Sequence, residues 1–223
     1  MGINLNLFMK QNFNNLSLRP PLFYSWKYGI RFEICNPSVM EHEDTNNLKQ
    51  IKERSTDIFN QVFQDTDDIF LITDVHCERN NTFLQKRPTN VYRKYIRSRE
   101  VLNKLQHTVL PSQLWDECEE DFDDMVTHRF ILRCKTSDIR YQPLLTAISY
   151  KDFWHPSRIL KRNYSSGYDI YFVNITKRKI YHLYDDRGCD VIATNKDDLY
   201  PLYEIHSDWI LDYDRDKINE LFK

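Results

Sequence analysis

The chain has 223 residues, of which 41% are hydrophobic and 29% charged, and its formal net charge at pH 7 is -2. This balance is typical of a globular protein, and the negative sign argues against a protein whose main task is to grip phosphate backbones. Only 4 glycines occur, and neither G-x-G-x-x-G nor a P-loop motif is present, so no known motif supports nucleotide binding.

The first half of the chain alternates helical and strand-like patterns. In order, it predicts a short helix over 3–13, a strand over 29–34, a long helix over about 45–64, a buried strand over 69–72 and surface helices between 78 and 111. The long helix rests on residues that recur at three- and four-residue steps: Leu48, Ile51, Ser55, Ile58, Phe59, Val62 and Phe63.

The second half is richer in strands. It predicts a strand over 128–134, a helix over 141–151, and then three consecutive strands with short links, over 169–174, 179–184 and 189–193. Two helices, over 195–206 and 214–222, close the chain, and Asp214 is placed to cap the last one. We therefore expect a single α+β domain over 1–223, with a mainly antiparallel sheet flanked by helices and a three-strand meander near the C-terminus.

The cysteines and the N-terminus indicate a cytoplasmic protein. No run of about 18 apolar residues could span a bilayer, and the opening MGINLNLFMKQNF lacks the basic and apolar regions of a signal peptide. The five cysteines form no C-x-x-C pair, which predicts reduced thiols, no zinc site and no other cofactor. They are Cys35, Cys77, Cys118, Cys134 and Cys189.

The stretch that most resembles a site is Asp185-Asp186-Arg187-Gly188, between the last two strands of the meander. Aspartates favour turns because their side chains bond nearby backbone amides, and a glycine late in a turn often has a positive φ. We therefore predict a tight turn with a positive φ at Gly188. The alternative is a divalent-cation or acid–base site formed by Asp185, Asp186 and Asp190, which Arg187 could instead neutralise.

Other candidates have simpler structural explanations. His128 and His182 fall on predicted strands, where we expect packed, hydrogen-bonded histidines. The stretch NVYRKYIRSR, 90–99, suggests nucleic-acid contact, but the negative net charge makes that partner unlikely. The acidic segment 116–124 is typical of a solvated loop, and it also suits a basic protein partner, which would bind Glu117, Glu119, Glu120, Asp121 and Asp123.

Several stretches together resemble an uncharacterised family of bacterial proteins, a domain of unknown function common in Gram-positive spore-formers. They are RPPLFYSWKYGIRFEI, THRFILRCKTSDIRYQPLLTAI, IYFVNITKRKIYHLYDDRGCDVIA and DWILDYDRDKINELF. The resemblance covers most of the chain and implies no activity, cofactor or catalytic residue.

Two functions remain after these observations. The first is a non-enzymatic protein-binding module of the toxin-immunity type, favoured by the absence of a catalytic motif and by the acidic segment. The alternative is a metal-dependent enzyme acting on nucleotides or phosphoesters through Asp185, Asp186 and Asp190. Neither reading specifies an oligomeric state.

Overall fold

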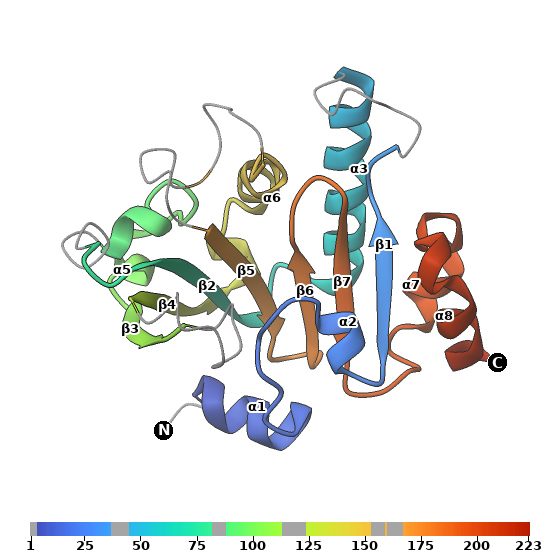
Figure 1. Ribbon diagram of the computed structural model, residues 1–223, viewed down its shortest axis with the longest axis horizontal. Coiled ribbons are helices and arrows are strands. Elements are labelled where there is room, and N and C mark those ends of the chain that lie inside the picture. The colour runs from blue at the N-terminus through green and yellow to red at the C-terminus, as the bar shows by residue number, and fades with distance from the viewer. Residues whose placement is uncertain (1–3, 37–44, 82–87, 113–123, 153–158, 160–166) are drawn as a thin grey trace.

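The computed structural model describes residues 4–36, 45–81, 88–112, 124–152, 159 and 167–223. Seven strands form one antiparallel sheet, with helices on both of its faces (Figure 1). The strand order is β1-β7-β6-β5-β2-β4-β3, so β2 is paired with both β4 and β5. The strands are β1 (Gly29–Glu33), β2 (Asp68–Glu78), β3 (Gln106–Pro111), β4 (Met125–Lys135), β5 (Gly167–Asn174), β6 (Lys179–Leu183) and β7 (Gly188–Ala193).

The longest described helix, α3, has 18 residues, and the other α-helices have between 4 and 9. The α-helices are α1 (Leu5–Phe13), α2 (Leu22–Ser25), α3 (Thr45–Val62), α5 (Arg99–Leu102), α6 (Tyr141–Ser149), α7 (Tyr200–Ile205) and α8 (Arg215–Phe222). The 3-10 turns are η1 (Pro88–Val91), η3 (Thr136–Asp138), η4 (Ser207–Trp209) and η5 (Asp212–Asp214). No helix in these described ranges combines the length and apolar character needed to cross a membrane.

The two faces of the sheet differ in chemistry. We call the side packed by α3 and α6 the α3 face; it is apolar, with Phe59 of α3 against Phe172 and Tyr181 of the sheet. The other side, the α1 face, is apolar where α1 covers it, and includes Phe70, Ile72, Tyr171, Val173, Ile180 and Ile192.

Beyond the apolar part, the α1 face continues as a row of buried polar side chains. Residues opposite each other on neighbouring strands point to the same face, and Arg31, Asp190, His182 and Tyr171 are successive partners across β1, β7, β6 and β5. Asp169 is opposite Asp74 in the same way. Arg31 and Asp169, at this polar end of the α1 face, line the candidate site described below.

The sequence predicted the fold class correctly, since the structure is α+β with an antiparallel sheet and the C-terminal meander β5-β6-β7. Most predicted elements are present, with ends displaced by a few residues. One prediction was wrong in part: one or two surface helices were expected between 78 and 111, and η1 and α5 lie there, but Gln106–Pro111 is the edge strand β3. Edge strands are exposed on much of their surface, so β3 lacks the apolar alternation that reveals a strand.

Two other predicted elements differ in length: one strand is longer than expected and one helix is shorter. The strand expected over 69–72 extends to Glu78, because Asp74 and His76 find polar partners on the buried α1 face. The helix expected from 195 begins only at Tyr200, with turns before it. The predicted acidic partner segment lies, up to residue 123, outside the described residues.

A charge-paired cleft at the end of the meander

The turn between β6 and β7 is built by Asp185 and Arg187. The backbone N–H of Arg187 donates to Asp185 Oδ1 at 2.8 Å, and the guanidinium Nε donates to Asp185 Oδ2 at 2.9 Å. A second guanidinium nitrogen also contacts that oxygen. The turn and the aspartate–amide bond were predicted from the sequence and are confirmed, and the contact between Arg187 and Asp185 was one of the alternatives left open there.

The reason given for Gly188 was wrong. No glycine of the described chain has a positive φ, and Gly188 is the first residue of β7. What requires glycine there is space: a Cβ would lie 2.5 Å from the carbonyl oxygen of Phe32 and would also overlap the Tyr184 hydroxyl. Only a residue without a side chain fits at position 188, because β1 and Tyr184 approach its backbone closely.

Beside this turn is a cleft of about 710 Å³, a volume usual for ligand sites. Pro20, Pro21 and Leu211 contribute apolar surface to its lining. Its charged lining includes three cations and their acidic neighbours, and the cations are Arg31, Lys151 and Arg187. They come from β1, the end of α6 and the β6–β7 turn, so three distant segments form one concave surface.

Asp169, at the floor of the cleft, is a buried carboxylate shared by three cationic or protonatable groups. His76 Nε2 lies 3.2 Å from Oδ2, while Lys151 Nζ donates to Oδ1 at 3.2 Å. His182 Nε2 is 3.6 Å from Oδ1. Burial by itself raises the pKa of Asp169, but His182, His76 and Lys151 outweigh it and hold the pKa well below its usual range. The floor therefore carries a fixed negative charge.

A second carboxylate of the row, Asp190, is in the opposite electrostatic situation. Its Oδ2 accepts the Phe23 backbone N–H at 3.1 Å, and Arg31 Nε is 3.9 Å from Oδ1. Burial raises the pKa of Asp190, and this effect exceeds the lowering by His182, the Phe23 amide and Arg31. Asp190 thus resists ionisation while Asp169 favours it.

Arg31 connects this row to the C-terminal region. Its guanidinium donates to the Tyr184 hydroxyl at 3.3 Å and to the Tyr24 hydroxyl at 3.1 Å, and lies 3.6 Å from Asp214. The Tyr24 hydroxyl in turn donates to Asp214 Oδ1 at 2.8 Å. Asp214 was expected to cap α8, but its side chain makes no capping bond, because it faces Tyr24 and Arg31 instead.

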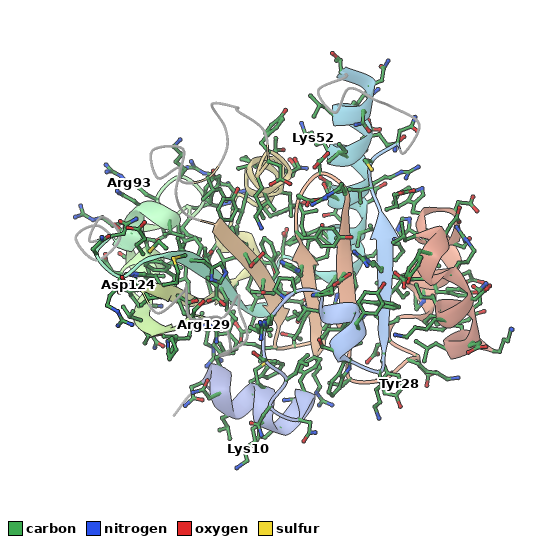
Figure 2. The ribbon with its side chains drawn as sticks, viewed as in Figure 1. Lys10, Tyr28, Lys52, Arg93, Asp124 and Arg129 are labelled. Carbon is green, nitrogen blue, oxygen red and sulfur yellow. The ribbon has the colours of Figure 1, made fainter. Side chains whose placement is uncertain are left out.

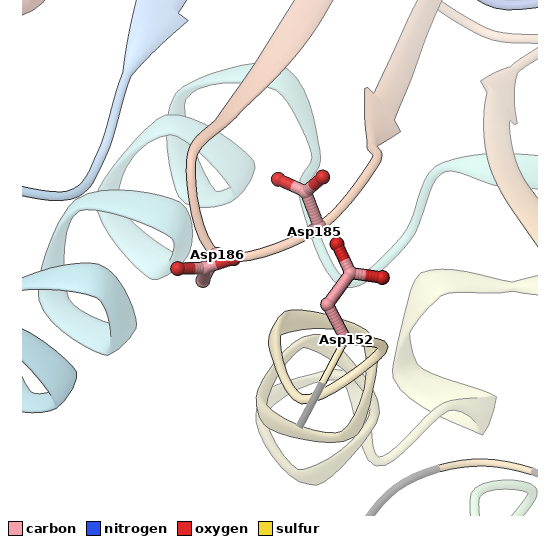
Figure 3. A group of neighbouring side chains, drawn as sticks. All are labelled: Asp152, Asp185 and Asp186. Carbon is pink, nitrogen blue, oxygen red and sulfur yellow. The ribbon is translucent and has the colours of Figure 1, made fainter. Parts of the chain in front are cut away.

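The carboxylates proposed as a metal site are only partly brought together. Asp185 and Asp186 each offer an oxygen within 4.8 Å of the other and of Asp152, which follows α6, whereas Asp190 is not in this group (Figure 3). Figure 3 shows the Asp152 side chain directed toward Asp185. Arg187 lies 3.6 Å from Asp152 as well as bonding Asp185, so a cation would have to compete with a guanidinium.

The two predicted packed histidines are buried, but their polar atoms are incompletely satisfied. His182 stacks on Tyr171 with ring centroids 4.5 Å apart, and neither ring nitrogen has a hydrogen-bond partner among the described residues. His128 Nδ1 lies 2.9 Å from Nε2 of His107, while its own Nε2 has no partner in the described chain. The prediction of a packed, hydrogen-bonded histidine is confirmed for His128, whereas His182 is packed without a hydrogen bond among the described residues.

Sequence reasoning missed the floor of the cleft: His76, Lys151 and Asp169 were not singled out. His76 and Asp169 are 93 residues apart and meet only because β2 is paired with β5. One signal was available, namely charged or histidine residues at positions of a strand that the alternation assigns to a buried face.

The thiols beside this network are in their unreactive form. Burial, followed by the charge of Glu33, raises the pKa of Cys35 to about 11. Burial also raises the pKa of Cys134 to about 12 and that of Cys189 well above its ordinary value. Thiols with raised pKa values are structural rather than nucleophilic, which agrees with the expectation from the sequence.

The fold and the cleft thus define an α+β protein with one concave, internally charge-paired surface. The chain belongs to the family described as Domain of unknown function (DUF3885), whose model matches residues 5–214. It is similar to the Uncharacterized protein YnaE of Bacillus subtilis (strain 168), with 33% identity over 216 residues that cover 95% of this chain and 99% of the relative. No solved structure matches this chain.

The resemblance stated from the sequence is therefore confirmed, both for the family and for its occurrence in Gram-positive bacteria.

Proposed function

We propose that this protein is a non-enzymatic binding module that holds a partner protein in the cleft beside the β6–β7 turn. The observation that carries the proposal is the internal pairing of the cleft's charges. Arg187 is bound to Asp185, Lys151 to Asp169, and Arg31 to two tyrosine hydroxyls next to Asp190. A polar surface held this way loses little entropy when a partner docks.

The titratable groups favour binding over catalysis. A general base or nucleophile needs a pKa near the working pH, or an activating neighbour. At the cleft the carboxyl of Asp169 is strongly acidic, and the Cys35 thiol and the Tyr184 hydroxyl have raised pKa values, chiefly through burial. These groups are suited to fixed charges and hydrogen bonds.

We propose further that the partner is a basic protein, as in a toxin-immunity pair. Three carboxylates lie within 4.8 Å of one another and Arg187 contacts two of them, so the formal charge of these four groups stays negative and would attract an arriving lysine or arginine. The acidic segment 116–124 would add long-range attraction and speed the encounter.

Site-specific photo-crosslinking tests the location. A photoreactive amino acid at Leu211 or Glu33, both in the cleft lining, should capture one discrete partner in native cells. The matched control is Val109, which is exposed on β3, at the opposite edge of the sheet from β1. Equal capture from Val109, or none from the cleft positions, would place the partner elsewhere or argue against one.

Two variants separate the cleft from the acidic segment. One replaces Asp152, which contacts Arg187 beside the cleft, with Asn, and the other neutralises Glu117, Glu119, Glu120, Asp121 and Asp123. If the partner is basic and docks in the cleft, D152N removes a charge at the interface and should speed dissociation of the complex. The segment variant removes long-range attraction and should slow association. Unchanged binding in both variants would reject the basic partner.

The metal-dependent enzyme remains a second candidate because Asp152, Asp185 and Asp186 converge. Carboxylate oxygens are the ligands that Mg²⁺ and Mn²⁺ prefer. Phosphoesterase activity that needs a divalent cation and disappears in both D152N and Asp186→Asn would support this function over binding.

A further inference from the structure

A second concave surface, separate from the cleft, has uncompensated positive charge. It is a groove of about 460 Å³ between α3, the turn after η1 and the start of α6. Its cations are Lys52, Lys94 and Arg140, and we call it the basic groove. The remaining lining residues are Tyr95, Gln142, Pro143 and Thr146, so no carboxylate is found among its described lining.

The three cations differ from those of the cleft. Within the described ranges, none of Lys52, Lys94 and Arg140 forms an ion pair, whereas Arg31, Lys151 and Arg187 all do. Like charges on one surface repel, and nothing in the described part of the groove offsets this repulsion. An anion bound between them would interact favourably with all three.

The backbone around the groove is firmly held. Arg140 N–H donates to the Tyr95 carbonyl at 2.7 Å, Arg97 N–H donates to the Asp138 carbonyl at 2.9 Å, and Ile96 and Ile139 form a β-bridge between them. These contacts tie the turn that carries Lys94 to the residue that precedes α6. The backbone positions of Lys94 and Arg140 are therefore fixed relative to each other before a ligand binds.

Helix α6 is joined to α3 at the same place. Tyr141, the first residue of α6, donates its hydroxyl to Asn60 Oδ1 at 3.0 Å and stacks on Phe59 with centroids 4.5 Å apart. The first turn of α6 contains no acidic residue, and its N-terminus has no side-chain cap. The partial positive charge of a helix N-terminus therefore adds to the field of the three cations.

The basic groove also includes part of the 90–99 stretch that suggested nucleic-acid contact. Single-stranded nucleic acid is held by aromatic rings that stack on bases. Tyr92 and Tyr95 are both buried, and the Tyr92 hydroxyl donates to the Leu71 carbonyl inside the fold, so neither ring is available for stacking. Of the 90–99 stretch, Lys94 and Tyr95 line the groove, and the Tyr95 ring is too buried to stack on a base.

We propose that the basic groove binds the phosphate group of a small molecule, through Lys52, Lys94 and Arg140. A phosphate oxyanion accepts bidentate bonds from arginine and point-charge contacts from lysine. A groove of this volume admits a mononucleotide or sugar phosphate, while the absence of available aromatic rings disfavours a nucleic-acid strand.

Calorimetric titration of the full-length protein with pyrophosphate, at low and constant ionic strength, tests the proposal. Wild type should bind, and Lys94→Gln and Arg140→Gln should each weaken binding by about tenfold, the loss expected for one charge-assisted hydrogen bond. The matched controls Lys10→Gln and Arg93→Gln remove the same charge outside the groove lining and should bind as wild type does. Figure 2 labels Lys10 and Arg93, and also Lys52 of α3.

Inorganic phosphate, a nucleoside monophosphate and a short single-stranded oligonucleotide complete the test. Stronger binding of the monophosphate than of phosphate, with the same loss in Arg140→Gln, would support a small phosphate ester. No binding of pyrophosphate, equal weakening by the controls, or binding of the oligonucleotide alone would overturn the proposal. Melting curves of each variant, recorded without ligand, separate lost binding from lost folding.

Discussion

The cleft and the basic groove each have three cations, yet they are opposite kinds of surface. In the cleft the cations are Arg31, Lys151 and Arg187, and each lies within 4 Å of a carboxylate. In the groove, Lys52, Lys94 and Arg140 have no carboxylate partner in the described structure. Charges that are paired inside the chain hold a preformed surface with little net attraction for an ion, whereas cations without an ion-pair partner attract an anion. The number of cations is therefore a weaker guide to function than their partners are.

The largest effect should come from removing the charge at the floor of the cleft. Asp169→Asn leaves His76 and Lys151 beside a neutral group and should lower the free energy of unfolding by about 3 to 5 kcal/mol at pH 7. The control is Asp68→Asn, at a half-exposed position 3.7 Å from Arg133, which should cost less than about 1 kcal/mol in urea denaturation.

The pH dependence sharpens the same test. Because the folded-state pKa of Asp169 is lowered, the Asp169 carboxylate makes its full contribution to the free energy of unfolding above the ordinary carboxyl pKa. That contribution is lost as the pH falls below about 4. The difference between wild type and Asp169→Asn should shrink over that range. A difference that stays constant down to low pH would mean that the carboxylate's charge is not what stabilises the cleft.

The next effect concerns the close approach at the turn. Gly188→Ala forces a Cβ against the Phe32 carbonyl and the Tyr184 hydroxyl, and should destabilise by about 1 to 3 kcal/mol. Gly167→Ala is the matched control, because no atom lies within 4 Å of its added Cβ, and it should be neutral or slightly stabilising. Thermal unfolding of both variants measures the difference, and equal melting temperatures would contradict the steric explanation.

Removing one lysine from each surface should have different effects on stability. Lys151→Met removes a partner of Asp169 and should cost about 1 to 2 kcal/mol, whereas Lys52→Met should change stability by less than about 0.5 kcal/mol. At low ionic strength Lys52→Met should be slightly stabilising, because repulsion in the groove falls. Equal losses from the two variants in denaturant titrations would erase the distinction between the surfaces.

The smallest effect is expected from divalent cations. Arg187 already contacts Asp152 and Asp185, so 5 mM Mg²⁺ (about the upper end of useful concentrations for a weak site) should leave the melting temperature of wild type unchanged. Arg187→Gln removes this competitor and should reveal any affinity of the three carboxylates. One tightly bound metal per chain in elemental analysis of purified wild type would favour the enzyme instead.

Much of the fold was predictable because its signals are local. The three- and four-residue steps of α3 and the turn chemistry around Asp185 depend on neighbours along the chain. The edge strand β3 was not predictable in this way, since its exposed residues give no alternation. For Gly188 the residue type indicated a special position, but the crowding that requires glycine comes from Phe32, a distant part of the chain.

The sequence by itself determined the α+β class, the meander, the aspartate turn before Gly188 and the absence of a C-x-x-C pair among the cysteines. Only the tertiary structure decided which charged groups lie together. It places Asp169 beside His76 and Lys151, Asp190 beside Arg31, and Lys52, Lys94 and Arg140 in the lining of one groove. The physical reason is that periodicity reports which side of an element is buried, while the identity of a partner depends on strand order and register. Those follow from burial summed over the whole chain, which no local pattern contains.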